Sequence, residues 1–307
     1  MVPTPVHFFP HSTGPALKPG SAAAVLPGVH ALALTLTLAW LQSPGPKELG
    51  LVTWGRNYQE ALQAAQGSGR PLLILFDEVP GCSTCVHYGE VVLSDALLVE
   101  AAETLFVPLA IYNNQGGEDR RVLELFQEPA WNNPVVQFVA ADGRRLIPRL
   151  AGDYSTSGLA AAMIAALRTA QRPVPEWLAI YAAALRAESA PRRTELRAMG
   201  CFWSGEACLA RAPGVISTRT GFVEGHEVVE VQYAEAEIDR AALEACGTQL
   251  RGNFVPSPKD QLYHLRRSRW AKLPLNPAQA RRVNAALSAS EDPRPFLSPR
   301  QLASTER

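Results

Sequence analysis

The stretch Pro71-Leu-Leu-Ile-Leu-Phe-Asp-Glu-Val-Pro-Gly-Cys-Ser-Thr-Cys85 decides the fold of the first half of this chain. Its first six residues form a continuous apolar run, which is typical of a strand buried on both faces of a sheet. Val79-Pro80-Gly81 then predicts a turn, and two cysteines separated by two residues follow. A Cys-x-x-Cys tetrad between a buried strand and a helix is an arrangement specific to thiol–disulfide chemistry.

The position of the tetrad predicts different roles for its two thiols. A helix N-terminus presents unpaired amides and the positive end of the helix dipole to Cys82, which lowers the thiol pKa. Cys85 lies one turn further on, within disulfide reach, where it can resolve a mixed disulfide. We therefore expect Cys82 to be the nucleophile and Cys85 the resolving thiol. The alternatives are a structural disulfide or half of a zinc site with His87, although no second cysteine pair has zinc-finger spacing.

Periodicity and turn signals extend this pattern to about residue 171. They predict helices over residues 57–66, from Ser94 as the cap, over 118–126 and over 157–170. Strands are predicted over residues 71–76, 105–112 and 135–140, and a last strand over 144–150 follows a turn at Asp142-Gly143. Parallel strands joined by helical crossovers, followed by an antiparallel hairpin, predict an α/β fold: a mixed sheet with helices on both faces.

Several of these residues resemble thioredoxin-fold proteins over roughly residues 50 to 170, namely Trp54, Tyr58, Arg70-Pro71-Leu72 and the Cys-x-x-Cys tetrad. More narrowly, Val79 to Thr84 resembles the VPGU-type thioredoxin-like selenoprotein family, in which the position of Cys82 is commonly selenocysteine. The resemblance implies a bacterial, cysteine-form homologue with Cys82 as the attacking group. It also implies that Pro134, after Asn133, is a cis-proline that faces the sulfurs and contacts the substrate.

A second cysteine motif, Gly200-Cys201-Phe202-Trp203-Ser204-Gly205-Glu206, lies in a further block that starts near Thr194. Glycine lets the chain turn tightly, so we expect Cys201 at a helix start, again the position of an activated thiol. Phe202 and Trp203 could form the wall of an apolar pocket. Equally, they could be core residues beside a buried structural thiol. Strands over residues 215–222 and 227–233 and helices over 239–246 and 276–287 complete the predicted block.

This motif resembles the opening of A-type peptide methionine sulfoxide reductases, and the likeness covers about residues 194 to 270. It implies a smaller α+β domain, a shortened form of that fold, with Cys201 as nucleophile, Phe202 and Trp203 around the substrate methyl, and Glu227 as the acid. The block departs from the family in lacking the tyrosine-bearing stretch before Gly225-His226 and one residue between His226 and Glu227. The family's oxygen-binding donors are therefore unassigned here.

The chain has five cysteines, and this odd number in a long chain argues against a disulfide framework. Cys208 follows Cys201 by seven residues, or ~10 Å along a continuous helix, which is too far for a disulfide between them. Cys246, at the end of a predicted helix, is the better resolving thiol for Cys201. The alternative for Cys208 and Cys246 is that both are simple buried thiols.

Composition excludes several classes of protein. Lys+Arg and Asp+Glu number 29 each, so no global field favours nucleic acid. Clusters such as Arg266-Arg267-x-Arg269 lack aromatic interleaving, so we interpret them as solvated surface. The predicted organisation is a leader over residues 1–48, a thioredoxin-like domain over 49–171, a helical linker over 172–193 and the second domain with its tail over 194–307.

The leader is rich in proline and contains an apolar run from Val29 to Leu41. This run has about the length of a signal-peptide hydrophobic region and is too short for a comfortable membrane span. We expect an exported or membrane-anchored protein on the periplasmic side, and a cytoplasmic one if the leader is not a signal. The alternatives are a disordered leader or a misassigned start.

Two functions follow from the motifs. The first is a thiol–disulfide oxidoreductase whose Cys82–Cys85 dithiol recycles a methionine sulfoxide reductase-like site at Cys201. The second is a stand-alone disulfide reductase or thiol peroxidase whose C-terminal domain is a non-catalytic binding module. A metal carrier is disfavoured because a second ligand pair is missing. The expected partners are oxidised protein thiols or methionine sulfoxide substrates and an upstream thiol reductant, with no cofactor, metal or nucleic acid.

Overall fold

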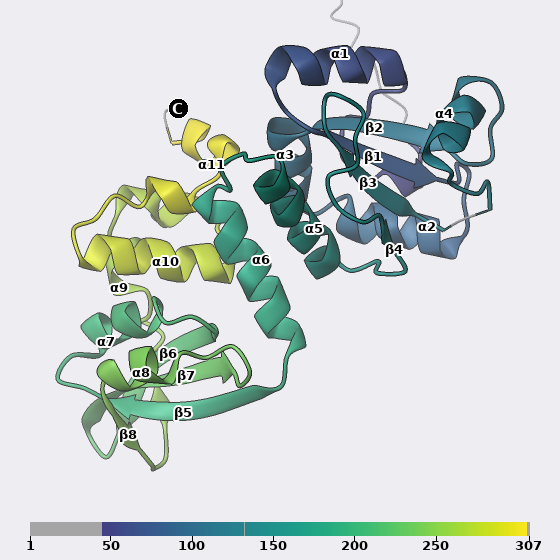
Figure 1. Cartoon of the computed structure of the whole chain (residues 1–307). Coiled ribbons are helices and arrows are strands. Elements are labelled where there is room, and N and C mark those ends of the chain that lie inside the picture. The colour runs from purple at the N-terminus through teal and green to yellow at the C-terminus, as the bar shows by residue number, and fades with distance from the viewer. Residues whose placement is uncertain (1–44, 132, 306–307) are drawn as a thin grey trace, which may run out of the picture. The chain divides into compact units, whose positions relative to one another are not determined.

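The structure is a computed structural model that describes residues 45–131 and 133–305 (Figure 1). Most of the predicted leader, including the apolar run from Val29 to Leu41, lies outside the described residues. Within the described ranges, no helix has the length and apolar character needed to cross a membrane. The described part of the chain contains two separate sheets.

The first sheet has the strand order β2-β1-β3-β4. β1 (Leu72–Asp77) runs parallel to β2 (Val107–Tyr112) and antiparallel to β3 (Val135–Val139), and β3 pairs with the short β4 (Leu150–Ala151). All six residues of β1 are buried, because the strand lies between two neighbours and is covered on both faces. The predicted mixed sheet is therefore confirmed.

Helices cover both faces of this sheet (Figure 1). Leu73 and Leu75 of β1 belong to an apolar cluster that contains residues of α3 and α5. Ile74 and Phe76 point the other way, into a cluster with residues of α1 and α4. The helices of this part are η1 (Lys47–Leu49), α1 (Tyr58–Ser68), α2 (Ser83–His87), the π-helical turn η2 (Tyr88–Val92), α3 (Ala96–Leu105), α4 (Glu118–Phe126) and α5 (Thr156–Thr169).

Two local predictions in this domain are wrong. The cap of α3 is Asp95 rather than Ser94, because the Asp95 carboxylate accepts from the amides of Leu97 and Leu98. The predicted strand over residues 144–150 is reduced to β4 and an isolated bridge between Val139 and Arg145. Pro148 lies in that stretch and has no N–H to donate to a ladder, so continuous pairing is interrupted.

The second sheet is antiparallel throughout, with the order β8-β5-β7-β6-β9. Its long hairpin turns at Glu224 and Gly225, whose φ angles of 50° and 82° are those that a tight two-residue hairpin turn requires. The strands are β5 (Arg192–Ala198), β6 (Val215–Val223), β7 (His226–Ala234), β8 (Thr248–Leu250) and β9 (Val255–Pro256).

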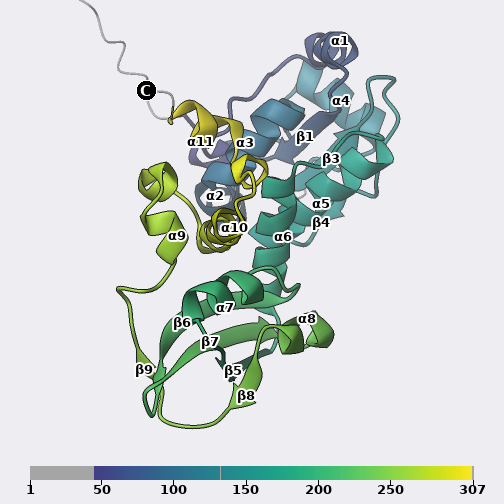
Figure 2. The ribbon, with the colours of Figure 1, turned by 90° about the vertical axis from the view of Figure 1, so that its left-hand side faces the viewer.

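Helices precede, interrupt and follow the second sheet (Figure 2). α6 lies within the predicted helical linker over residues 172–193 and ends only three residues before β5. The capping box of α10, in which Asn276 and Gln279 satisfy each other's backbone amides, explains its start. The helices are α6 (Glu176–Ser189), α7 (Phe202–Leu209), α8 (Arg240–Ala245), α9 (Tyr263–Arg266), η3 (Arg269–Lys272), α10 (Pro277–Ser288), η4 (Arg294–Phe296) and α11 (Pro299–Ala303).

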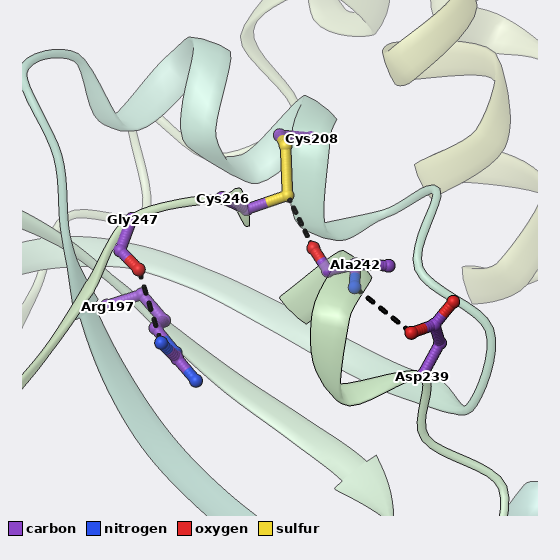
Figure 3. The surroundings of a disulfide bond; sticks show 6 residues. All are labelled: Arg197, Cys208, Asp239, Ala242, Cys246 and Gly247. Atoms are coloured by element: carbon purple, nitrogen blue, oxygen red, sulfur yellow. Dashed lines mark hydrogen bonds between the residues drawn. A yellow bond between two sulfur atoms is a disulfide. The ribbon is translucent and has the colours of Figure 1, made fainter. Parts of the chain in front are cut away.

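A disulfide between Cys208 and Cys246 joins the end of α7 to the end of α8 (Figure 3). The two Cα atoms lie 5.6 Å apart although the residues are separated by 38 positions in the sequence. This corrects two predictions: the chain does contain a structural disulfide, and Cys246 is not a free thiol that could resolve Cys201. Sequence spacing does not reveal such a pair, because the intervening β6–β7 hairpin is what returns α8 to α7.

Candidate redox site

The Cys-x-x-Cys tetrad lies where β1 ends and α2 begins. Cys82 is the N-cap residue of α2, and its carbonyl accepts the amide of Val86 at 3.0 Å. Both cysteines are free thiols: Cys82 is exposed, Cys85 is fully buried, and their Sγ atoms lie 3.3 Å apart. The Cys82 sulfur is therefore accessible to a macromolecular substrate, whereas the Cys85 sulfur is shielded from solvent.

The surroundings move the pKa values of the two thiols in opposite directions. The backbone amide and the thiol of Cys85, with the amide and hydroxyl of Thr84, donate toward the Cys82 sulfur and lower its pKa. Burial raises the pKa of Cys85 well above its usual range, and the neighbouring Asp77 and Cys82 raise it further. At neutral pH the thiolate form is therefore more populated at Cys82 than at Cys85, and the Cys85 thiol stays protonated.

A buried carboxyl group, which the sequence analysis did not identify, belongs to this site. Asp77 is the last residue of β1 and is fully buried. Burial raises the pKa of its carboxyl to about 7, against hydrogen bonds from Cys85 and the Glu78 amide that lower it. The available signal was an acidic residue at the end of an otherwise apolar strand, directly before the tetrad.

A second missed residue, Glu48 of η1, contacts the residue directly before the tetrad. Its side chain is buried, and its Oε1 accepts the amide of Gly81 at 2.7 Å. Gly81 is required at this position, because a Cβ there would lie 2.6 Å from the Cβ of Cys85 and 2.3 Å from the Glu78 carbonyl oxygen. No sequence pattern connects Glu48 to a glycine 33 residues away.

The predicted loop Asn133-Pro134 does reach the tetrad, but through its asparagine. The Cys82 thiol donates to Asn133 Oδ1 at 3.4 Å. The prediction of a cis bond before Pro134 is wrong: among the described residues, the cis peptide bond is Val79–Pro80. Residue type does not decide this point, since the trans form of an X-Pro bond is favoured by only ~0.5–1 kcal/mol.

The second predicted site gathers around the start of α7. Cys201 is the N-cap residue of this helix and is a half-buried free thiol. The Glu227 carboxylate, which comes from β7, accepts the amide of Phe202 at 2.8 Å. It therefore sits at the positive end of α7, next to the cysteine. Glu227, which only the family resemblance suggests as the acid, thus contacts the residue next to Cys201.

Aromatic rings pack against one another at the start of α7. Phe202 is buried, with ring centroids 5.3 Å from Phe222 and 5.9 Å from Trp203. Trp203 stacks on Tyr263, with centroids 3.8 Å apart and planes at 20°. Tyr263 comes from α9, 60 residues further along the chain than Trp203. Phe202 is therefore a core residue and Trp203 is half-buried, while their role around a substrate methyl group stays a prediction.

His87, the residue named for the zinc alternative, is exposed on α2. Within residues 45–131 and 133–305, no group of three or more His, Cys, Asp or Glu side chains could hold a metal ion. Among the same residues no hydrogen bond or disulfide joins Cys201 to Cys82 or Cys85, and all three are free. The structure therefore contains free thiols at two separate positions, the start of α2 and the start of α7.

Comparison with known proteins agrees with the fold of the first sheet. A thioredoxin-like family model matches residues 53–141, so this part of the chain is a thioredoxin-like domain. No curated protein matches the chain. Neither the VPGU-type family nor methionine sulfoxide reductase A is among these findings, and both resemblances stay predictions.

Similar solved structures include a DsbH oxidoreductase, with 19% identity and a TM-score of 0.34 over 42% of this chain and 92% of the other. A thioredoxin from Thermus thermophilus has 24% identity and a TM-score of 0.32, over 37% of this chain and 85% of the other. A disulphide-isomerase-like protein from Bacteroides thetaiotaomicron has 20% identity and a TM-score of 0.32, over 37% of this chain and 92% of the other.

Proposed function

We propose that this chain is a thiol–disulfide oxidoreductase in which Cys82 is the nucleophile and Cys85 the resolving thiol. The observation that carries the proposal is an exposed sulfur 3.3 Å from a buried one at a helix N-terminus. The opposite pKa shifts of the two thiols support it. The attacking group must be a thiolate, and the resolving thiol must stay protonated until the mixed disulfide has formed.

The reaction begins when the Cys82 thiolate attacks one sulfur of a substrate disulfide. A mixed disulfide forms and the first substrate thiolate leaves. Cys85 then gives its proton to the Asp77 carboxylate, whose pKa of about 7 suits a proton acceptor at neutral pH. The Cys85 thiolate attacks Cys82 Sγ, which releases the second substrate thiolate and leaves a Cys82–Cys85 disulfide. An upstream thiol reductant restores the dithiol.

The test is reduction of insulin disulfides by the full chain with dithiothreitol as the electron source. We expect Cys82→Ser to abolish the catalysed rate and Cys85→Ser to accumulate a mixed disulfide with the substrate. Cys201→Ser is the matched control, because it removes a thiol from the other site, and its rate should equal that of the wild type. Insulin reduction that survives in Cys82→Ser would refute the assignment.

A second activity is favoured by the position of Glu227, whose carboxylate lies at the start of α7 beside Cys201. We propose that Cys201 reduces methionine sulfoxide. Its thiolate attacks the sulfoxide sulfur, Glu227 protonates the oxygen, and methionine leaves with Cys201 as a sulfenic acid. Cys82 then attacks the Cys201 sulfur, water leaves, and a Cys82–Cys201 disulfide forms. Cys85 resolves it, which regenerates the Cys201 thiol.

The Cys208–Cys246 disulfide supports this route, since it leaves Cys201 without a free resolving thiol in its own block. A dithiol on the same chain has an effective concentration that can reach the millimolar range. The test is reduction of free and peptide-bound methionine sulfoxide, with Cys201→Ser as the inactive variant. Mass spectrometry of Cys85→Ser during turnover should show a Cys82–Cys201 cross-link. Normal insulin reduction without sulfoxide reduction would leave the second block as a binding module.

We propose that the protein is exported and works on the periplasmic side of the membrane.

A further inference from the structure

We infer that the Cys201 site selects acidic polypeptide segments, so that its methionine sulfoxide substrate carries a carboxylate close to the oxidised residue. The inference rests on the proposed reductase activity of Cys201 and names its substrate class. The feature that carries it is a three-layer stack of Trp203, Tyr263 and Arg267, which extends from the cysteine motif to an exposed guanidinium.

The stack has a definite order. The centroid of the Tyr263 ring lies 3.8 Å from that of Trp203 and 3.6 Å from the Arg267 guanidinium carbon. Two groups so close to the centre of one ring can only lie on its opposite faces. Trp203 is the second residue of α7 and follows Cys201, the N-cap residue, by two positions. The stack therefore begins close to Cys201 along the chain and ends at a fixed positive charge.

Buried polar side chains hold this segment in place. The Glu206 carboxylate accepts the amide of Leu262 at 2.7 Å, and the Asn284 side-chain oxygen accepts the amides of His264 and Leu265, each at 3.0 Å. Glu206 and Asn284 are both fully buried. The backbone around Tyr263 is therefore fixed on both sides, and Arg267, whose Nη1 also donates to the Tyr263 carbonyl oxygen, is part of a built surface.

The charges around the stack are mostly unpaired. Arg266 and Arg267 are exposed, and within the described part of the chain neither forms an ion pair with a carboxylate. The nearby Asp260 accepts the hydroxyl of Ser257, and Asp292 pairs with Arg294 rather than Arg269. Residues 258–272 contain five basic side chains against one acidic side chain, in a chain whose total charge is balanced.

The chemistry of this surface suits a carboxylate. Guanidinium groups bind carboxylates through two parallel hydrogen bonds, and a guanidinium stacked flat on a ring keeps its N–H edge available for them. The sequence alone predicts solvated surface for the arginine clusters, because no aromatic residues are interleaved with them. The fold supplies the aromatic contact instead, since Tyr263 lies one helical turn before Arg267.

The test uses three short peptides with one methionine sulfoxide, flanked by glutamate, glutamine or lysine, and the full chain with dithiothreitol. We expect the KM of the glutamate peptide to be about tenfold below that of the glutamine peptide, as for one charged hydrogen-bonded contact. The lysine peptide should have the highest KM, and added salt should reduce the differences in KM among the three peptides.

Arg267→Gln should remove most of the preference for glutamate through KM rather than kcat, and Arg267→Lys should restore part of it through charge alone. The matched control is Arg251→Gln, which removes an exposed, unpaired arginine from the β8–β9 loop and should keep the wild-type preference. Equal KM values for the glutamate and lysine peptides in the wild type would overturn the inference and leave the reductase proposal intact. Failure to reduce any of the peptides would overturn the reductase proposal, and the inference with it.

Discussion

Replacing Asp77 by asparagine tests the electrostatics of the tetrad most directly. The side chain keeps its shape and loses only its ionisable proton. Asp77 is fully buried at the end of β1, and burial raises the pKa of its carboxyl to about 7. The substitution should therefore stabilise the reduced protein, and by an amount that depends on pH.

The sign follows from the linkage of protonation and folding. The unfolded chain loses the Asp77 proton near its ordinary pKa of 3.8, whereas the folded chain keeps it until about 7. A raised folded-state pKa contributes stability at low pH, and this contribution is lost as the pH rises through the window between the two values. The difference between these two pKa values corresponds to about 4 kcal/mol, of which about 3 kcal/mol falls between pH 5 and pH 8.

The assay is urea unfolding of the reduced wild type and Asp77→Asn at pH 5 and at pH 8. The stability gained by the variant should be about 3 kcal/mol larger at pH 8 than at pH 5. Any cost of burying an amide without full hydrogen bonding is the same at both pH values and cancels in this difference. Glu60→Gln, at an exposed carboxylate of α1, is the control and should show no such difference. Equal gains at pH 5 and pH 8 in Asp77→Asn would show that the carboxyl does not change its protonation over this range.

Three further predictions concern the other thiols and the proposed acid. Iodoacetamide at pH 7 should alkylate Cys82 at least 100-fold faster than Cys85, as peptide mapping would show, and similar rates would contradict the opposite pKa shifts. Replacing Cys208 and Cys246 together by serine should lower the free energy of unfolding by about 4 kcal/mol, the loop-closure value for their separation, as measured by urea unfolding. A cost near zero would mean that the cross-link does not constrain the unfolded chain. Glu227→Gln keeps an oxygen that can accept the Phe202 amide but removes the acid, so kcat/KM on methionine sulfoxide should fall by about 100-fold or more while insulin reduction is unchanged.

The fold of the first domain could be predicted because its central strand is unambiguous. The apolar run from Pro71 to Phe76 was assigned to a strand, and β1 covers residues 72–77. The helix over residues 118–126 coincides with α4. Both patterns involve only residues close together in the sequence, and hydrophobic periodicity predicts local structure of this kind.

The missed features depend on contacts between distant segments. Glu48 meets Gly81 across 33 residues, and Cys208 meets Cys246 across 38. No local pattern encodes these approaches, because they follow from how η1 packs beside α2 and how the β6–β7 hairpin folds back. Asp77 was missed for a different reason: sequence patterns assign an acidic residue after an apolar run to the strand's end, whereas here the carboxyl remains in the core.

The disulfide between Cys208 and Cys246 limits which thiols can react with Cys201. All five cysteines lie among the described residues, and with this pair closed only Cys82, Cys85 and Cys201 are free. A sulfenic acid on Cys201 therefore has to be reduced from outside its own block, either by the Cys82–Cys85 dithiol or by a thiol of another molecule. In the proposed route, opening the 208–246 disulfide would free Cys246 as a second thiol that could compete with the dithiol for Cys201. The closed disulfide removes that competitor and also holds the end of α7, the helix that begins at Cys201.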